Sequence, residues 1–312
     1  MTAGGRPSPI KAANEVSILL RTVLGEDRFP VNVEAVAKDY STKFPDPITK
    51  VVGESLGEFE GMLRPGRKKP AWHIIYNNAT DYRGRERFTL AHEFGHYLLH
   101  RRPLSAREIA AGLDADEAET RSFACSPMEQ NTWKSADSGR IEEEADTFAS
   151  YLLMPMDDYR LQVEGLDIDR DLLRHVTGRY GVSLTAAVRK LIEFTDRRAA
   201  MVVARDGFAL WGRASREALK TGIFIRSGME IPDLSIAAQG PTAQQGESVR
   251  PIELPEGVWS FKRGSETVRE LTIFSPRLAK SLSILLFEDR PYHHDLEEEP
   301  YRDTFDQLQS FG

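Results

Sequence analysis

The sequence contains a single cysteine, Cys125, among its 312 residues. One thiol cannot form a disulfide within the chain, and it cannot build a zinc site from cysteine ligands. A disulfide framework and a cysteine-based metal site are therefore both excluded.

Long hydrophobic runs are also missing. The longest runs, such as 151–154 and 284–287, fall far below the ~20 apolar residues that a transmembrane helix needs. The N-terminal stretch MTAGGRPSPIKAANEV has no apolar segment of the kind found in a secretory signal peptide. We therefore expect a soluble, cytoplasmic protein.

Positive charge is in deficit, because 41 lysine and arginine residues face 48 aspartate and glutamate residues, for a formal net charge of −7. This balance argues against a globally basic nucleic-acid binder, although a local basic patch is still compatible with it. Hydrophobic residues make up 40% of the chain, which is enough for a folded core and too much for a disordered chain. The length favours two domains, at ~150 residues each.

Apolar periodicity predicts a mostly helical part over residues 10–196. Its extended element is a β-hairpin, with strands at 56–64 and 71–77 on either side of a Pro/Gly-rich turn. Residues 1–9 are rich in glycine, proline and serine, and we expect them to be disordered. Helices are expected at 10–24, 32–39, 85–100, 114–123, 140–154, 156–163, 168–178 and 183–196.

The pattern changes after about residue 200. Two alternating segments, 200–204 and 208–211, flank Asp206-Gly207, which is a hairpin signal. We expect a small α+β domain over 200–290 and an acidic tail at 291–312. Further strands are expected at 222–226, 257–262, 268–274 and 282–287.

His92, Glu93 and His96 form the pattern H-E-x-x-H within the helix expected at 85–100. Four residues along a helix advance ~6 Å and rotate the side chain only ~40° past a full turn, so the two histidines can share one cation. Glu93 lies ~100° round the helix from His92, where it would flank the metal within reach of a bound water. The alternative is a helix with two ordinary histidines, but its apolar face indicates that they are buried and need partners.

A zinc site that keeps an open position needs a third protein ligand. The helix expected at 140–154 begins with Glu142, Glu143 and Glu144, any of which could supply it. The alternative explanation is an acidic helix N-terminus, because the helix dipole favours carboxylates there. Both can hold, since one glutamate can bind a metal while the others cap the helix.

The segments RFTLAHEFGHYLLH and IEEEADTFASYLLMP, in this order, resemble the ImmA/IrrE family of zinc metallopeptidase-like proteins. In that family an H-E-x-x-H helix is followed by a helix of the form E-x-x-A-[ND]-x-F-A-x-x-L-L-M-P. The resemblance covers about residues 10–195. It implies an α+β fold, with a mostly helical zincin-like metallopeptidase domain that contains a small β-hairpin or sheet, followed here by the small C-terminal α+β domain. Some family members carry a C-terminal sensing domain, and sensing or partner docking is our hypothesis for this one.

Carried over position by position, the resemblance makes His92 and His96 ligands of Zn²⁺ and Glu93 the general base. It places the family's third ligand at Glu142, with the next two glutamates as fallbacks. Asp146 stands where the family often has asparagine, and it could orient a ligand histidine. The implied reaction is zinc-assisted attack of water on a peptide carbonyl, in which Glu93 takes a proton and later gives it to the leaving amine.

The resemblance further implies a narrow protein substrate. This would be a helix-turn-helix repressor or antitoxin, which is cut to regulate transcription, for example in a stress response. The first alternative is a non-proteolytic, partner-binding module in which the metal site is only structural.

Residues 168–196 suggest a second alternative, because they look like a helix-turn-helix whose second helix begins at Ser183. The stretch is locally basic, but the start of its second helix, SLTAA, offers few groups that could bind base edges. We therefore expect a packing module within the peptidase domain, and we do not expect direct DNA binding.

Overall fold

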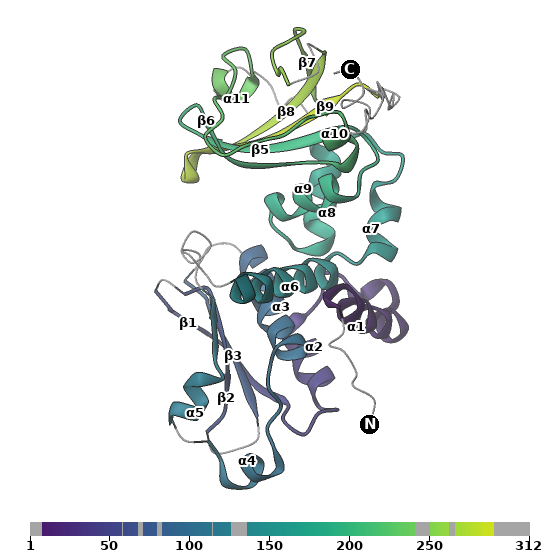
Figure 1. Cartoon of the computed structure of the whole chain (residues 1–312). Helices are drawn as coiled ribbons and strands as arrows, with labels where there is room; N and C mark the ends of the chain where they lie inside the picture. The colour runs from purple at the N-terminus through teal and green to yellow at the C-terminus, as the bar shows by residue number, and fades with distance from the viewer. Residues whose placement is uncertain are drawn as a thin grey trace, which may run out of the picture. The chain divides into compact units, whose positions relative to one another are not determined.

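The computed structural model describes residues 8–57, 59–67, 71–79, 83–113, 115–125, 136–240, 250–261 and 266–289. The chain divides into two compact units, Met1–Leu191 and Ile192–Gly312. Both combine helices with a sheet, so the predicted α+β class is confirmed (Figure 1). The predicted acidic tail at 291–312 lies outside the described residues.

The first unit is mostly helical and contains one small sheet. Its strands are β1 (Ile48–Glu54), β2 (Gly61–Pro65), β3 (Trp72–Asn77) and β4 (Phe123–Cys125). Its helices are α1 (Pro9–Leu24), η1 (Gly25–Arg28), α2 (Val33–Ser41), α3 (Arg83–Leu99), α4 (Ala106–Ala111), α5 (Ala115–Thr120), α6 (Ala136–Leu153), α7 (Met156–Val163), α8 (Arg170–Tyr180) and α9 (Leu184–Phe194), the last of which ends in the second unit.

Most of the predicted helices are confirmed within a few residues, but two predictions are wrong in part. Ser8 and Pro9 are not disordered: the Ser8 side chain accepts a hydrogen bond from Lys11 N, and Pro9 begins α1, where its fixed φ suits the first turn. The single helix expected at 114–123 is shorter, because β4 takes over at Phe123. The short helix α4, capped by Ser105, was not expected.

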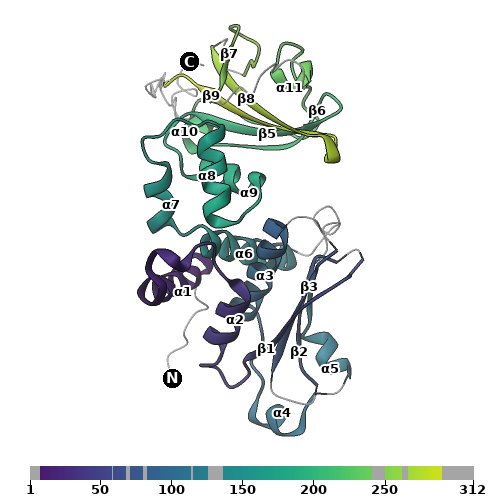
Figure 2. The same cartoon turned by 180° about the vertical axis from the view of Figure 1, so that it is seen from behind.

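The four strands of the first unit are arranged in the order β1-β3-β2-β4. The predicted hairpin is confirmed, because β2 pairs with β3 in antiparallel fashion, although its first strand begins at Gly61 rather than at residue 56. Strand β1 was not predicted. It is a half-exposed edge strand that pairs in parallel with β3, so its apolar pattern is weak. Helices α3 and α6 lie side by side, and α3 contacts β2 and β3 (Figures 1 and 2).

The second unit is built on an antiparallel sheet with the strand order β6-β5-β9-β8-β7. The predicted Asp-Gly hairpin is confirmed, since Asp206 and Gly207 both have positive φ angles, of 51° and 79°. The elements are β5 (Ala199–Arg205), β6 (Phe208–Ala214), α10 (Arg216–Lys220), α11 (Ile236–Gln239), β7 (Ile252–Leu254), β8 (Val268–Ser275), η3 (Pro276–Leu278) and β9 (Lys280–Phe287).

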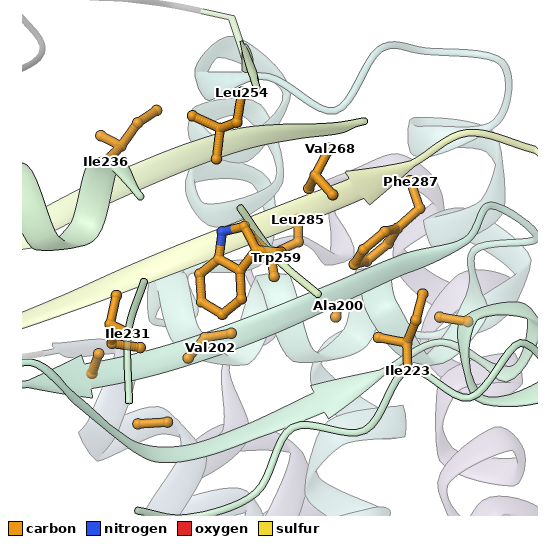
Figure 3. Packing of buried hydrophobic residues seen from close by; sticks show 13 residues of the cluster. Ala200, Val202, Ile223, Ile231, Ile236, Leu254, Trp259, Val268, Leu285 and Phe287 are labelled. Carbon is orange, nitrogen blue, oxygen red and sulfur yellow. The ribbon is translucent and has the colours of Figure 1, made fainter. Parts of the chain in front are cut away.

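The strand predicted at 222–226 is wrong, and so is the one predicted at 257–262 over its described residues, 257–261. Both segments are apolar because they fill the core of the second unit, and they do so as irregular chain. Ile223 is fully buried, and Trp259 is 2% exposed with its indole ring lying among the buried side chains of the sheet (Figure 3). Trp259 Nε1 donates to the buried carboxylate of Glu270 over 3.0 Å. Burial without strand pairing explains the false strand signal.

A buried arginine, Arg198, joins the start of the second unit to its last described residues. Its guanidinium forms two hydrogen bonds with the carboxylate of Glu266, at 2.8 and 3.0 Å, and also donates to Thr221 Oγ1. It donates as well to the carbonyl oxygen of Glu288 over 2.6 Å. None of the helices in the described ranges has the length and apolar character needed to cross a membrane.

Candidate metal centre

Helix α3 presents the two histidines of the H-E-x-x-H motif toward a common point. His92 is 7% exposed and His96 is fully buried. Their Nε2 atoms lie 3.0 Å apart. The i, i+4 spacing therefore brings the two ring nitrogens together, one turn above the other.

Helix α6 brings Glu142 to the same point. Its Oε2 lies 3.3 Å from His92 Nε2, and its Oε1 lies 3.6 Å from His96 Nε2. One potential ligand atom from each of the three residues lies within 4.8 Å of the other two. Within the described part of the chain, no second group of three or more His, Cys, Asp or Glu residues meets this criterion.

The two glutamates that follow Glu142 take different positions. Glu143 is exposed. Glu144 is half-buried, and its Oε2 lies 3.0 Å from His100 Nε2. Of the three glutamates that the sequence offers, Glu142 is the one that joins the two histidines.

The spacing of the three donor atoms fits a zinc ion. Nitrogen and oxygen ligands at about 2.0–2.1 Å from a tetrahedral Zn²⁺ lie about 3.3 Å from one another. The separations among His92, His96 and Glu142 are 3.0, 3.3 and 3.6 Å. Two imidazoles and one carboxylate are also a donor set that zinc uses in catalytic sites, where a fourth position stays open.

The close approach of α3 to α6 depends on Gly95, which lies between the two histidines in sequence. A Cβ atom at Gly95 would lie 3.0 Å from Phe148 Cδ1 and 3.3 Å from the Cα and O atoms of Ala145. The ring of Phe94 also packs edge-on against Phe148, with centroids 5.5 Å apart. A small residue at the helix crossing thus lets a glutamate of α6 reach histidines of α3.

Each of the two histidines makes a second hydrogen bond through its other ring nitrogen. His92 Nδ1 lies 2.8 Å from Asp146 Oδ1. His96 Nδ1 lies 3.0 Å from His100 Nδ1, a residue one further turn along α3. Such contacts fix the orientation of a histidine and the nitrogen that carries its proton.

The carboxylates also control the charge of His92. Burial by itself lowers the pKa of this imidazole, but the hydrogen bonds that it donates to the carboxylates of Asp146 and Glu142, helped by the negative charge of Glu93, raise the pKa to about 10. The site therefore favours a positive charge at this point, and a cation bound there would take the place of that proton.

Glu93 lies beside the three donor residues, between α3 and the sheet. It is fully buried. A Cβ atom at Gly61 of β2 would lie 2.6 Å from Glu93 Oε1 and 2.6 Å from Thr89 Cγ2. The carboxylate of Glu93 therefore occupies space that a side chain on β2 would fill.

Two tyrosines, one on α3 and one on α6, make contacts of their own. Tyr97 is buried, and its hydroxyl donates to the carbonyl oxygen of Asp46 over 3.0 Å. Burial also raises the pKa of the Tyr97 hydroxyl. The ring of Tyr151 lies under the ammonium group of Lys190, which is 3.4 Å from the ring centroid.

Sequence reasoning missed two neighbours of the site. Gly61 gives no signal, because a glycine in a predicted strand does not reveal which residue approaches it. Phe123 of β4 stacks on His96, with centroids 4.9 Å apart and an interplanar angle of 16°, but it belongs to a strand that was read as the end of a helix. Both residues reach the site through the sheet, whose order is not encoded locally.

Comparison with known proteins places both motif helices in one family. Residues 49–191 match the M78 peptidase model, described as the IrrE N-terminal-like domain. No curated protein matches the sequence. A solved structure, described as a Mycobacterium tuberculosis transcriptional regulator, is similar with a TM-score of 0.51 and 12% identity, over 89% of this chain and 76% of that chain. At this identity the likeness concerns the fold alone.

The family match spans α3 and α6, the two helices that carry the donor residues, and it agrees with the resemblance of their sequence motifs. The first unit therefore contains an IrrE N-terminal-like domain, with the metallopeptidase fold of that family.

Proposed function

We propose that this chain is a zinc-dependent endopeptidase that cleaves one specific protein partner and so acts as a regulator. The observation that carries the proposal is the cluster of His92, His96 and Glu142, with the buried carboxylate of Glu93 beside it. Three ligands that leave a position open, next to a carboxylate that is not one of them, are the arrangement of hydrolytic zinc sites.

In this proposal each residue has a defined role. His92, His96 and Glu142 hold the zinc, which when bound would polarise a peptide carbonyl and make a water molecule more acidic. Glu93 takes a proton from the attacking water and later delivers it to the amine that leaves. Asp146 holds the ring of His92 in place through Nδ1.

The partner class comes from the family. The resemblance of this sequence to the ImmA/IrrE family implies a helix-turn-helix repressor or an antitoxin as the substrate. The fold likeness to a protein described as a transcriptional regulator is compatible with a regulatory role. We therefore propose that cleavage of a transcription factor is the biological reaction.

The decisive experiment compares wild type with Glu93→Gln and His96→Ala. Any helix-turn-helix protein found to be encoded beside this chain is tested as the substrate, and cleavage is followed by mass spectrometry with added zinc. We expect wild type to cut at one position, Glu93→Gln to bind zinc but lose cleavage by a factor of at least ~10², and His96→Ala to lose zinc.

A different outcome would favour the non-proteolytic alternative. If wild type and Glu93→Gln both bind zinc and both bind the partner, and neither cuts it, the metal site is a structural or docking element. Metal analysis of the purified proteins separates this result from simple loss of the metal.

Direct DNA binding through α8 and α9 is not favoured. Two of the basic side chains on these helices are engaged within the fold: Arg179 pairs with Asp158 over 2.7 Å, and Lys190 is 1% exposed with its ammonium group 3.4 Å from the ring centroid of Tyr151. They are therefore not available to neutralise phosphates. A gel-shift titration with duplex DNA at near-physiological salt should show no specific complex.

A further inference from the structure

The two ring nitrogens of His96 face different partners. Its Nε2 points at His92 Nε2 and Glu142, where a metal would bind, and its Nδ1 points at His100 Nδ1 over 3.0 Å. A neutral imidazole has one N–H donor and one acceptor nitrogen, so only one of its two tautomers can bind a metal through Nε2. In that tautomer His96 Nδ1 carries the proton.

His100 has to accept this proton's hydrogen bond through its own Nδ1. Its remaining proton then lies on Nε2, which faces Glu144 Oε2 over 3.0 Å. An ionised carboxylate can only accept hydrogen bonds. Glu144 therefore fixes the direction of both hydrogen bonds: His96 Nδ1–H donates to His100 Nδ1, and His100 Nε2–H donates to Glu144.

Because these side chains are buried, water cannot easily replace either of the two hydrogen bonds. His96 is fully buried and His100 is 7% exposed. The ring of Phe123 lies flat against His96 and 6.4 Å from the centroid of His100. A donor in such a place that loses its acceptor is left without compensation from solvent.

Helix α6 carries a carboxylate on each side of its contact with α3, and each carboxylate orients one of the two histidines of the motif. Successive residues of a helix are 100° apart, so Glu144 and Asp146 flank the buried Ala145 on opposite sides. Asp146 contacts His92 directly, whereas Glu144 acts through His100. A carboxylate of α6 therefore contacts His92 directly, whereas His96 is linked to a carboxylate of α6 only through a second histidine.

We propose that His100 and Glu144 form a positioning relay that holds His96 in the tautomer with a free Nε2, and that this relay sets the affinity of the site for zinc. The inference rests on the proposed zinc site and adds two positioning residues to it. Neither residue belongs to the donor cluster itself.

The test measures zinc affinity by competition with a chromophoric chelator. The variants are His100→Phe, which keeps a ring but removes the acceptor, and His100→Asn, whose side-chain oxygen can stand near the place of Nδ1. Glu144→Ala removes the far end of the relay. Glu143→Ala is the matched control, because it removes the same charge from the neighbouring, exposed position of α6.

We expect His100→Phe and Glu144→Ala to weaken zinc binding by about 10–100-fold, the usual effect of removing an outer partner of a metal ligand. His100→Asn should recover most of the loss that His100→Phe causes, and Glu143→Ala should bind like wild type. If His100→Phe binds zinc within twofold of wild type, the relay is refuted. Should that variant fail to fold, as judged by circular dichroism, Glu144→Ala against Glu143→Ala gives the same decision.

A second measurement separates this inference from the proposed function. The ¹⁵N chemical shifts of the histidine rings report which nitrogen carries the proton, and we expect Nε2–H on His100. A proton on His100 Nδ1 contradicts the relay, even in a protein that binds zinc tightly. A wild type that binds no zinc contradicts the proposed function, while the ring shifts of the same sample still decide the relay.

Discussion

At the scale of single residues, the position of Glu93 depends on a side chain that β2 does not have. Gly61 lies so close to Glu93 that a Cβ atom there would stand 2.6 Å from the carboxylate. Glu93 is fully buried and cannot swing into solvent to make room. The glycine therefore acts on the proposed general base through space alone.

Gly61→Ala tests this effect. The added methyl group should push the carboxylate of Glu93 away from its place, and a misplacement of about 1 Å can cost ~10² in rate. We expect kcat/KM for partner cleavage to fall by that order, while zinc affinity changes less than about twofold. Gly178→Ala is the control, because a Cβ atom there meets nothing within 4 Å. Unchanged cleavage by Gly61→Ala would show that Glu93 is not placed by β2.

The residues of the donor cluster were predictable to different degrees. The H-E-x-x-H spacing alone predicts that His92 and His96 face one point, because the helix repeat requires it. The choice of Glu142 over its two neighbours needed the resemblance of the second motif to a family. The contact between His100 and Glu144 could not be predicted, because it depends on how α6 crosses α3 and no local pattern encodes that crossing.

At the scale of elements, the crossing of α3 and α6 sets the size of the cluster. The two histidines come from one helix and the carboxylate from the other, so any separation of the helices opens the site. Gly95 is the point of contact, with Ala145 and Phe148 opposite it. Stability and metal affinity should therefore respond together to a change at this position.

Gly95→Val adds two methyl groups and a Cβ at this crossing. Overpacking of this kind costs about 1–3 kcal/mol of unfolding free energy, and the displaced helix should weaken zinc binding in the same variant. Chemical denaturation and chelator competition measure the two effects. Gly178→Val places the same atoms in open space on α8 and should leave zinc affinity unchanged. A stable Gly95→Val protein with full zinc affinity would refute the coupling.

Elements were predictable where the local pattern decided them. The long amphipathic helices and the Asp-Gly hairpin have strong local signals, and they are confirmed. Strand β1 was missed because its pairing partner β3 lies more than 20 residues away and its own pattern is half exposed. The segments at 222–226 and 257–261 gave false strand signals because their apolar residues pack into the core as irregular chain.

At the scale of the whole molecule, acid stability of the first unit should depend on Asp158. This carboxylate is 3% exposed and accepts hydrogen bonds from Arg179 at 2.7 Å and from the Tyr180 hydroxyl at 2.6 Å. Burial alone raises the pKa of Asp158, but the hydrogen bonds from Arg179 and Tyr180 outweigh it and lower the pKa below the ordinary value. Because the pKa is lower in the folded state than in the unfolded state, the ionised carboxylate of Asp158 stabilises the fold above pH ~4. This stabilisation is lost as the pH falls through the pKa of the folded state.

Asp158→Asn should therefore unfold more easily than wild type at pH 7, by about 1.5–3 kcal/mol, and the difference should shrink toward pH 3. Urea denaturation at a series of pH values measures it. Asp171→Asn is the control, because Asp171 is exposed and its pair with Arg174 spans 3.8 Å. A difference between wild type and Asp158→Asn that stays constant with pH would contradict the assignment.

The change of pattern near residue 200 and the small α+β domain after it followed from periodicity, whereas the fold of the metallopeptidase domain was implied by the family resemblance. The strand order β6-β5-β9-β8-β7 followed from neither, because it pairs the first long strand of the second unit with the last. Pairings over some 80 residues are set by which faces bury together, and this information is absent from any one segment.

The bond from Arg198 to the carbonyl oxygen of Glu288 has a practical consequence for protein engineering. A truncated version that stops before Glu288 deletes an acceptor from a guanidinium sealed inside the fold, and one that stops before Phe287 also deletes the amide that donates to the Arg198 carbonyl oxygen over 2.9 Å. An expression boundary placed at the end of β9, after Phe287, would therefore remove the carbonyl oxygen of Glu288 and leave the Arg198 guanidinium without that acceptor.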